Sequence, residues 1–126
     1  MLANSSLIAF VATQDLERAR VFYGAALGLA LNSESPFALE FDAAGTMLRI
    51  TGVAEINAAP YTVLGWRVAN IREAVAALAR KGIVFELYAG MLQDGLSIWS
   101  SPSGVLVAWF KDPDGNVLSL TEFPES

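Results

Sequence analysis

The sequence predicts an α+β fold made of two tandem copies of one unit, a strand followed by a helix and three further strands. Several short segments alternate apolar and polar residues with a period of two, which is typical of strands, and two segments repeat apolar residues every three or four positions, which is typical of helices. The two halves also superpose, because Asp15 aligns with Asn70 and Leu16 with Ile71, an offset of 55 positions. A repeat of this length indicates a duplicated supersecondary unit.

The first predicted unit covers about residues 5–53. Asp15 is the expected N-cap of its helix and Gly28 the expected end, because Asp favours the first position and Gly the last. The predicted elements are a strand at Leu7–Thr13, a helix from Asp15 to Gly28, and strands at Phe37–Asp42 and Thr46–Gly52 joined by a turn at Ala43–Gly45.

The second predicted unit covers about residues 61–123, and together the two units form a single domain, residues 1–126. Asn70 is the expected N-cap of its helix, and Gly82 follows the last helical turn. The predicted elements are a strand at Tyr61–Ala69, a helix from Asn70 to Gly82, a strand at Ile83–Ala89, a short segment at Leu96–Ser100, and a hairpin of Val105–Lys111 and Asn116–Glu122.

The composition limits the chemistry that the chain can perform. It contains neither Cys nor His, which excludes disulfides, thiol nucleophiles, Ser-His-Asp triads and the usual zinc sites. The net charge of -5, without a Lys/Arg cluster, disfavours nucleic acid as a partner. No apolar run is long enough to cross a membrane and no signal peptide is apparent, so we expect no membrane association and a cytoplasmic location.

The alternation within the strands assigns residues to two faces. One face, which we expect the helices to cover, contains Ala9, Val11, Leu48, Ile50, Leu64, Trp66, Val68, Leu118 and Leu120. The opposite face mixes apolar walls with a few polar groups, as small-molecule sites do, although a solvent-facing sheet is the alternative. It contains Ile8, Phe10, Ala12, Met47, Arg49, Thr51, Val63, Gly65, Arg67, Val117, Ser119 and Thr121.

Several side chains of the mixed face are candidates for ligand binding. Arg49 and Arg67 each need an anionic group if they are buried, which a ligand or a protein carboxylate would supply. Glu40 is one such carboxylate, but a change of one residue in the turn at Ala43–Gly45 would reverse its direction, and the sequence leaves both directions open. Asp112 and Asp114, in the segment DPDG, are expected to form a turn rather than a catalytic pair.

Aromatic residues provide the expected stacking surfaces. Trp109 precedes Phe110, so the two side chains point to opposite sides, and we expect Phe110 in the core and Trp109 in the site. Trp99 and Phe10 are further candidates, and a subunit contact is an equal alternative for Trp99. Trp66 belongs to the helix-covered face.

Three segments carry a family resemblance: DLERARVFYGAALGL, NIREAVAALARKGI and WFKDPDGNVLSL. Together they resemble the vicinal oxygen chelate superfamily, which includes glyoxalase I, bleomycin resistance proteins and extradiol dioxygenases. The resemblance implies two βαβββ modules whose sheets form a cup, with a metal bound at four positions in many members. The matching positions here are Ile8, Arg49, Val63 and Ser119, which are poor or impossible metal ligands.

We therefore expect a metal-independent binding protein without a cofactor, resembling the drug-sequestering resistance proteins. Its expected ligand is a small aromatic or heterocyclic molecule, and its expected assembly is a homodimer, as is common in the family. The predicted ligand-binding residues are Phe10, Met47, Arg49, Arg67, Trp99, Trp109, Ser119 and Thr121. The alternative is a metal-free lyase, isomerase or hydrolase that uses Arg49 as electrophile and Glu40 or a Tyr as proton carrier. The sequence identifies neither the ligand nor any catalytic residue.

Overall fold

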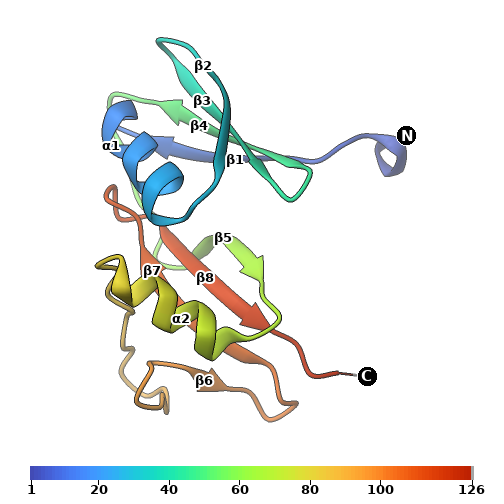
Figure 1. Cartoon of the computed structure of the whole chain (residues 1–126), viewed down its shortest axis with the longest axis vertical. Helices are drawn as coiled ribbons and strands as arrows, with labels where there is room; N and C mark the ends of the chain where they lie inside the picture. Colours follow the sequence, from blue (N-terminus) through green and yellow to red (C-terminus); the bar gives the residue numbers. More distant parts are fainter. Residues whose placement is uncertain (126) are drawn as a thin grey trace. The chain divides into compact units, whose positions relative to one another are not determined.

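The computed structural model describes residues 1–125 and separates into two compact units, Met1–Asn57 (unit one) and the part that begins at Ala58 (unit two) (Figure 1). Each unit contains one four-stranded mixed sheet and one helical element that follows the first strand. This arrangement confirms the predicted α+β class and the tandem repeat.

Unit one has the strand order β1-β4-β3-β2. Strand β1 runs parallel to β4, and the other neighbours are antiparallel. A π-helical segment continues α1, so the predicted helix changes its hydrogen-bond pattern halfway. The elements are the 3-10 helix η1 (Leu2–Asn4), β1 (Ile8–Thr13), α1 (Leu16–Arg20), the π-helical segment η2 (Val21–Ala26), β2 (Ala30–Glu34), β3 (Ala38–Ala43) and β4 (Thr46–Gly52).

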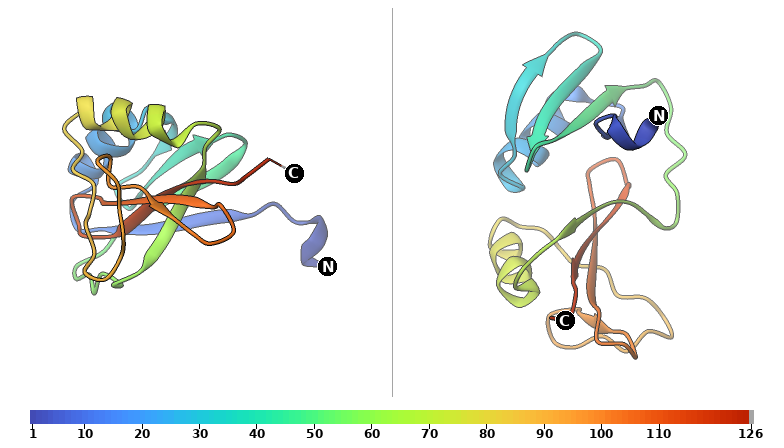
Figure 2. Two further views of the ribbon diagram at one scale, coloured as in Figure 1. Left: turned by 90° about the horizontal axis from the view of Figure 1, so that it is seen from below. Right: turned by 90° about the vertical axis from the view of Figure 1, so that its right-hand side faces the viewer.

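Unit two repeats the same topology with the order β5-β8-β7-β6, and β5 runs parallel to β8. Helix α2 lies across one face of this sheet (Figure 2), where it contacts β7 and β8. The elements are β5 (Thr62–Arg67), α2 (Ile71–Arg80), β6 (Trp99–Ser100), β7 (Leu106–Lys111) and β8 (Val117–Glu122). No helix within residues 1–125 has the length and apolar character needed to span a membrane.

The two helices begin with equivalent caps, as the sequence predicts. The Asp15 carboxylate accepts a hydrogen bond from the Arg18 amide at 3.0 Å, and the Asn70 side chain accepts one from the Glu73 amide at 3.1 Å. Each cap satisfies a backbone donor that has no partner within the helix. Glu122 accepts a further hydrogen bond from the Ile71 amide at 2.8 Å, which joins the end of β8 to the start of α2.

The helix-covered face of each sheet forms the core of its unit. The buried strand residues of unit one include Val11, Leu39, Phe41, Leu48 and Ile50, and those of unit two include Ala108, Phe110, Leu118 and Leu120. Ala19 and Tyr23 are buried on the helical side in unit one, and Ile71 and Val75 in unit two. Burial of these apolar surfaces is the main stabilising contribution to each unit, and it leaves the opposite sheet face available for other roles.

The hairpin between β3 and β4 decides the direction of Glu40. Ala43 pairs with Thr46, so the turn consists of Ala44 and Gly45, which both have positive φ. Two central residues with positive φ are typical of the turns that suit the twist of a hairpin. As a result Glu40 pairs with Arg49 on the open face, whereas Leu39 and Phe41 point to the core.

Two elements differ from the sequence prediction. Strand β2 was not predicted, because the segment ALNSE is an edge strand without apolar alternation. The predicted strand Ile83–Ala89 is wrong: it forms only an isolated bridge between Phe85 and Phe110. The Gln93 side chain accepts from the Tyr88 amide at 2.9 Å and donates to the Glu86 carbonyl at 2.9 Å, so it replaces a strand partner for this segment.

Candidate functional site

Three aromatic side chains gather on the open face of the unit-two sheet. The Trp109 ring, on β7, lies 6.2 Å from the Trp99 ring on β6, measured between ring centroids. Tyr88, from the segment between α2 and β6, meets Trp109 edge to face, with ring centroids 5.4 Å apart and planes at 82°. Edge-to-face contacts of this kind are favourable and hold both rings in defined orientations.

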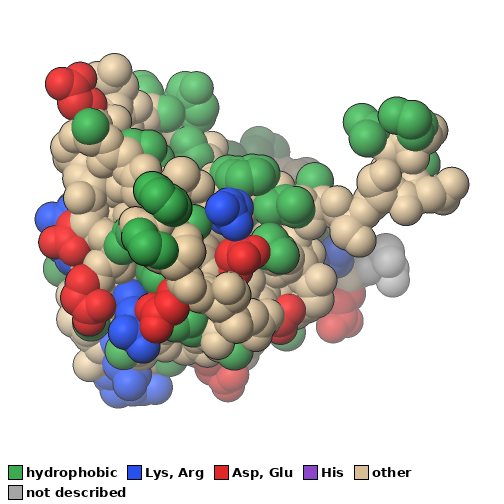
Figure 3. Space-filling model, turned by 90° about the horizontal axis from the view of Figure 1, so that it is seen from above, with side chains coloured by type: hydrophobic (Ala, Val, Ile, Leu, Met, Phe, Trp, Pro, Cys, Tyr) green, Lys and Arg blue, Asp and Glu red, His purple; other side chains and the backbone are tan. Residues whose placement is uncertain are grey.

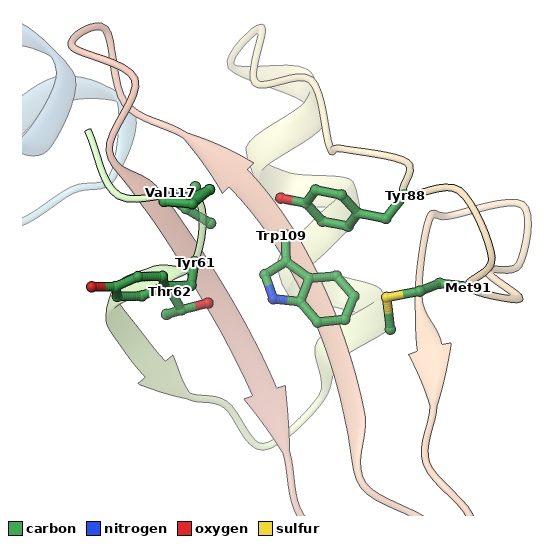
Figure 4. A pocket seen from close by; sticks show the side chains of 7 residues that line it. Tyr61, Thr62, Tyr88, Met91, Trp109 and Val117 are labelled. Atoms are coloured by element: carbon green, nitrogen blue, oxygen red, sulfur yellow. The ribbon is translucent and has the colours of Figure 1, made fainter. Parts of the chain in front are cut away.

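A pocket of about 330 Å³ opens beside this cluster. Figure 4 shows its side chains converging from β5, β7, β8 and the segment that carries Tyr88 and Met91. Its volume lies within the range of small-molecule sites, and a mainly apolar lining with few polar groups is their usual composition. The lining residues are Pro60, Tyr61, Thr62, Tyr88, Met91, Trp109 and Val117, none of which is charged.

The wall formed by Tyr88 and Met91 depends on Gln93. Besides its contacts to Tyr88 and Glu86, the Gln93 amide donates to the Ser97 carbonyl at 2.8 Å. The Met91 amide donates to the Tyr88 carbonyl at 3.1 Å, which closes a turn at Gly90, where φ is 83°. Sequence reasoning missed Tyr61, Thr62, Tyr88, Met91 and Gln93 as site residues. Tyr88, Met91 and Gln93 lie in a segment that forms no regular strand, so strand alternation does not assign them to a face.

A bulge in β5 corrects one predicted position. Thr62 pairs with Val117, whereas Leu64 pairs with Leu118, so β5 advances two residues while β8 advances one. The predicted alternation placed Val63 beside Val117 on the open face. The extra residue gives this place to Thr62, which lines the pocket. Bulges shift the alternation of a strand in this way and have no reliable sequence signal.

Ser119 lies next to the pocket but does not line it. It pairs with Gly65 on one side and with Trp109 on the other, and only 6% of its surface is exposed. A methyl group added at Gly65 would approach the Ser119 hydroxyl oxygen to 2.9 Å. The absence of a side chain at Gly65 is therefore what leaves room for Ser119.

Thr121 and Arg67 lie farther along the same strands and pair with each other. The Arg67 guanidinium lies 4.9 Å from the centroid of the Phe123 ring, a cation–π distance. Arg67 is exposed, so it does not require the buried anionic partner that we considered from the sequence.

The remaining predicted residues lie together on the open face of unit one. Phe10 on β1 lies opposite Arg49 on β4 in the strand register. Its side chain faces solvent, and 60% of its surface is exposed. Met47 is two positions along β4 from Arg49. The Arg49 guanidinium lies 3.4 Å from the Glu40 carboxylate, so a protein carboxylate supplies the anionic partner.

The DPDG segment forms a turn, as predicted. The Asp112 carboxylate accepts hydrogen bonds from the Asp114 amide at 3.0 Å and from the Asn116 amide at 2.9 Å. Gly115 adopts the positive φ of 87° that the turn requires. These contacts assign Asp112 to the β7–β8 connection.

Comparisons with known proteins decide the family. The model of the glyoxalase/bleomycin resistance protein/dioxygenase superfamily matches residues 7–120, nearly the whole chain. The chain belongs to this superfamily. No curated protein sequence matches the chain significantly.

Solved structures of superfamily members share the fold at low sequence identity. A glyoxalase family protein from Enterococcus faecalis has a TM-score of 0.74 at 22% identity, with 97% of this chain and 100% of that chain covered. A lactoylglutathione lyase from Agrobacterium tumefaciens has a TM-score of 0.72 at 17% identity, covering 94% and 93% of the two chains. A genomically encoded fosfomycin resistance protein from Listeria monocytogenes has a TM-score of 0.74 at 11% identity, covering 96% and 94%.

The four positions that the family resemblance matches to metal ligands have side chains that do not fit a metal ion. Ile8 and Val63 have no donor atom, and the Arg49 guanidinium is a cation paired with Glu40. Ser119 offers one neutral hydroxyl oxygen, which divalent metals bind weakly. Within residues 1–125, no group of three or more His, Cys, Asp or Glu side chains is placed to hold a metal.

Proposed function

We propose that the chain is a metal-independent small-molecule-binding protein, similar in mode of action to the drug-sequestering members of its superfamily. The observation that carries the proposal is the pocket beside Trp109, with its aromatic walls and uncharged lining. Such a pocket retains a planar aromatic or heterocyclic molecule by burial and ring contact. Stoichiometric binding requires no catalytic group, which suits a chain without His or Cys.

Trp109 is the proposed anchor for this ligand, because it contributes the largest ring among the lining residues. Aromatic residues that fill the centre of a site account for a large share of binding energy. We expect Trp109→Ala to weaken ligand binding at least about tenfold. Trp66→Phe is the matched control, because Trp66 pairs with Leu120, whose side chain is buried on the helix-covered face of the same sheet.

The test is a native mass spectrum of the purified protein, compared with its mass after denaturation. Binding predicts an organic adduct on the native chain that is absent from Trp109→Ala and present on Trp66→Phe. One divalent metal ion per chain would contradict metal independence. An adduct of equal occupancy on all three proteins would remove Trp109 from the site.

A glyoxalase-related lyase or isomerase is the second candidate, favoured by the ion pair of Glu40 and Arg49 at 3.4 Å. In this alternative Arg49 polarises a substrate oxygen and Glu40 carries the proton. Arg49→Ala would then abolish turnover and leave the thermal unfolding temperature nearly unchanged. Tyr88 is a poor base for such chemistry, because burial and the Glu86 carboxylate raise the pKa of its phenol, although Lys111 lowers it in part.

We further propose that the protein is a homodimer. Exposed apolar side chains on unit one, among them Ile8, Phe10 and Met47, are the support for this proposal. Sedimentation equilibrium tests it, and a monomer at micromolar concentration would contradict it.

Binding of nucleic acid is disfavoured by the net charge of -5, and on the face in Figure 3 basic side chains are interspersed with acidic ones. The cytoplasmic location stays a prediction, as do the roles of Phe10, Met47, Arg49, Arg67, Trp99, Ser119 and Thr121 in binding.

A further inference from the structure

We infer that the ligand of the Trp109 pocket is an uncharged planar aromatic molecule whose hydrogen-bond acceptors, such as a ring carbonyl, accept from the Tyr88 hydroxyl or from the Trp109 indole N–H. This inference rests on the proposed binding function and specifies its ligand class. It depends on two features of the pocket. Two hydrogen-bond donors, the Tyr88 hydroxyl and the Trp109 indole N–H, belong to its lining, and no charged side chain does.

The two polar atoms come from different elements, and both belong to side chains that line the pocket. In Figure 4 the Tyr88 oxygen points toward Val117, and the nitrogen edge of the Trp109 ring faces Tyr61 and Thr62. Among residues 1–125 neither atom makes a hydrogen bond to the protein, and no fully buried side-chain nitrogen or oxygen there lacks a partner. Both atoms are therefore open to the pocket and to whatever occupies it.

The chemistry of these two atoms selects an acceptor. An indole N–H donates and never accepts, so a ligand without an acceptor at that place leaves it unpaired. A buried donor without a partner loses the hydrogen bond that it makes with water, which weakens binding. Tyr88 adds a second donor, since its raised pKa keeps the phenol protonated well above neutral pH.

The surrounding charges favour an uncharged ligand. The lining residues include no Asp, Glu, Lys or Arg, so neither an ammonium nor a carboxylate finds a counter-charge within the pocket. The ionised residues that act on Tyr88 are Glu86 and Lys111, and these two pair with each other at 3.6 Å. A charged ligand would lose its hydration without a compensating ion pair.

Four bicyclic probes of similar size separate the possible ligand classes. Coumarin is uncharged and carries a carbonyl acceptor, whereas indene is a hydrocarbon without one. N-methylquinolinium is a cation without an acceptor, and naphthoate is an anion with acceptors. Affinities measured by calorimetry or tryptophan fluorescence on the full chain, at one pH and salt concentration, rank these classes directly.

We expect coumarin to bind about tenfold more tightly than indene, the difference that one or two hydrogen bonds supply. Tyr88→Phe keeps the ring and removes one donor, so the ratio of the coumarin affinity to the indene affinity should fall by about threefold or more. A far-UV circular dichroism spectrum identical to that of the wild type establishes that the variant is folded.

The outcomes separate this inference from the proposed function. Equal affinities for coumarin and indene, or an unchanged ratio in Tyr88→Phe, would overturn the ligand class and leave the binding function in place. Tightest binding of N-methylquinolinium or naphthoate would overturn it in favour of a charged ligand. No binding of any probe to the folded protein would contradict the binding function and the inference together.

Discussion

Gly65 and Ser119 lie side by side on β5 and β8, and the space between them is too small for a methyl group. A Cβ at Gly65 would lie 2.9 Å from the Ser119 hydroxyl oxygen and 3.4 Å from the Ser119 carbonyl oxygen. Ser119 also pairs in register with Trp109 of the aromatic cluster. The close approach of β5 and β8 at this point therefore requires a residue without a side chain at position 65.

Gly65→Ala is expected to lower the free energy of unfolding by about 1–3 kcal/mol, because the new methyl group overpacks the site against Ser119. Ser119→Ala removes the hydroxyl and should relieve much of this cost. Urea unfolding of the wild type, both single variants and the double variant measures the coupling between the two positions. Additive effects of the two substitutions would show that the close approach has no energetic consequence.

The segment between α2 and β6 is irregular, yet side chains fix its course. Besides the Gln93 contacts, the Asp94 carboxylate accepts hydrogen bonds from the Leu96 amide at 2.8 Å and the Ile98 amide at 3.0 Å. The second Asp94 oxygen lies 3.0 Å from the Arg72 guanidinium of α2. These contacts hold the segment that positions Tyr88 and Met91, so the pocket wall is ordered without belonging to a regular strand.

The charge of Asp94 makes part of this order dependent on pH. Burial alone would raise the pKa of Asp94, but the hydrogen bonds from Ile98 and Leu96, together with Arg72, hold that pKa below its ordinary value. A carboxyl with a depressed folded-state pKa stabilises the protein above its unfolded-state pKa and loses this contribution as the pH falls through the folded-state value.

Asp94→Asn should therefore lower the urea midpoint at about pH 7, and the difference from the wild type should shrink as the pH falls below about 4. Asparagine keeps an oxygen that accepts from the backbone, so the substitution isolates the charge. A difference that stays constant over the whole pH range would contradict this account of Asp94.

At the same scale, the sequence predicted most elements and missed those without a periodic signal. Asp15 and Asn70 marked both helix starts correctly, because capping depends on local chemistry. The alternation in β8 separated Leu118 and Leu120 from Ser119 correctly. The β5 bulge and the Gln93 contacts depend on tertiary pairing, so the pocket residues Thr62, Tyr88 and Met91 were beyond prediction.

The whole molecule consists of one supersecondary unit used twice, with equal strand order and equal placement of the parallel pair. The open faces of the two sheets nevertheless carry different chemistry. Unit one presents Phe10 and the Glu40–Arg49 ion pair, whereas unit two presents the aromatic pocket around Trp109. The repeat was predictable because both units share helix caps and the spacing of apolar residues. The different chemistry of the two open faces comes from a few side chains outside that pattern.

The most direct test of the binding account is a nitrogen–proton correlation spectrum recorded during a titration with coumarin. The chain contains three tryptophans, so three indole signals are expected, and Trp109→Phe identifies one of them by its loss. The account predicts a saturable shift of the Trp109 indole signal, with the Trp66 signal unchanged. A Trp109 signal that stays in place while coumarin binds, or while other signals shift, would contradict it.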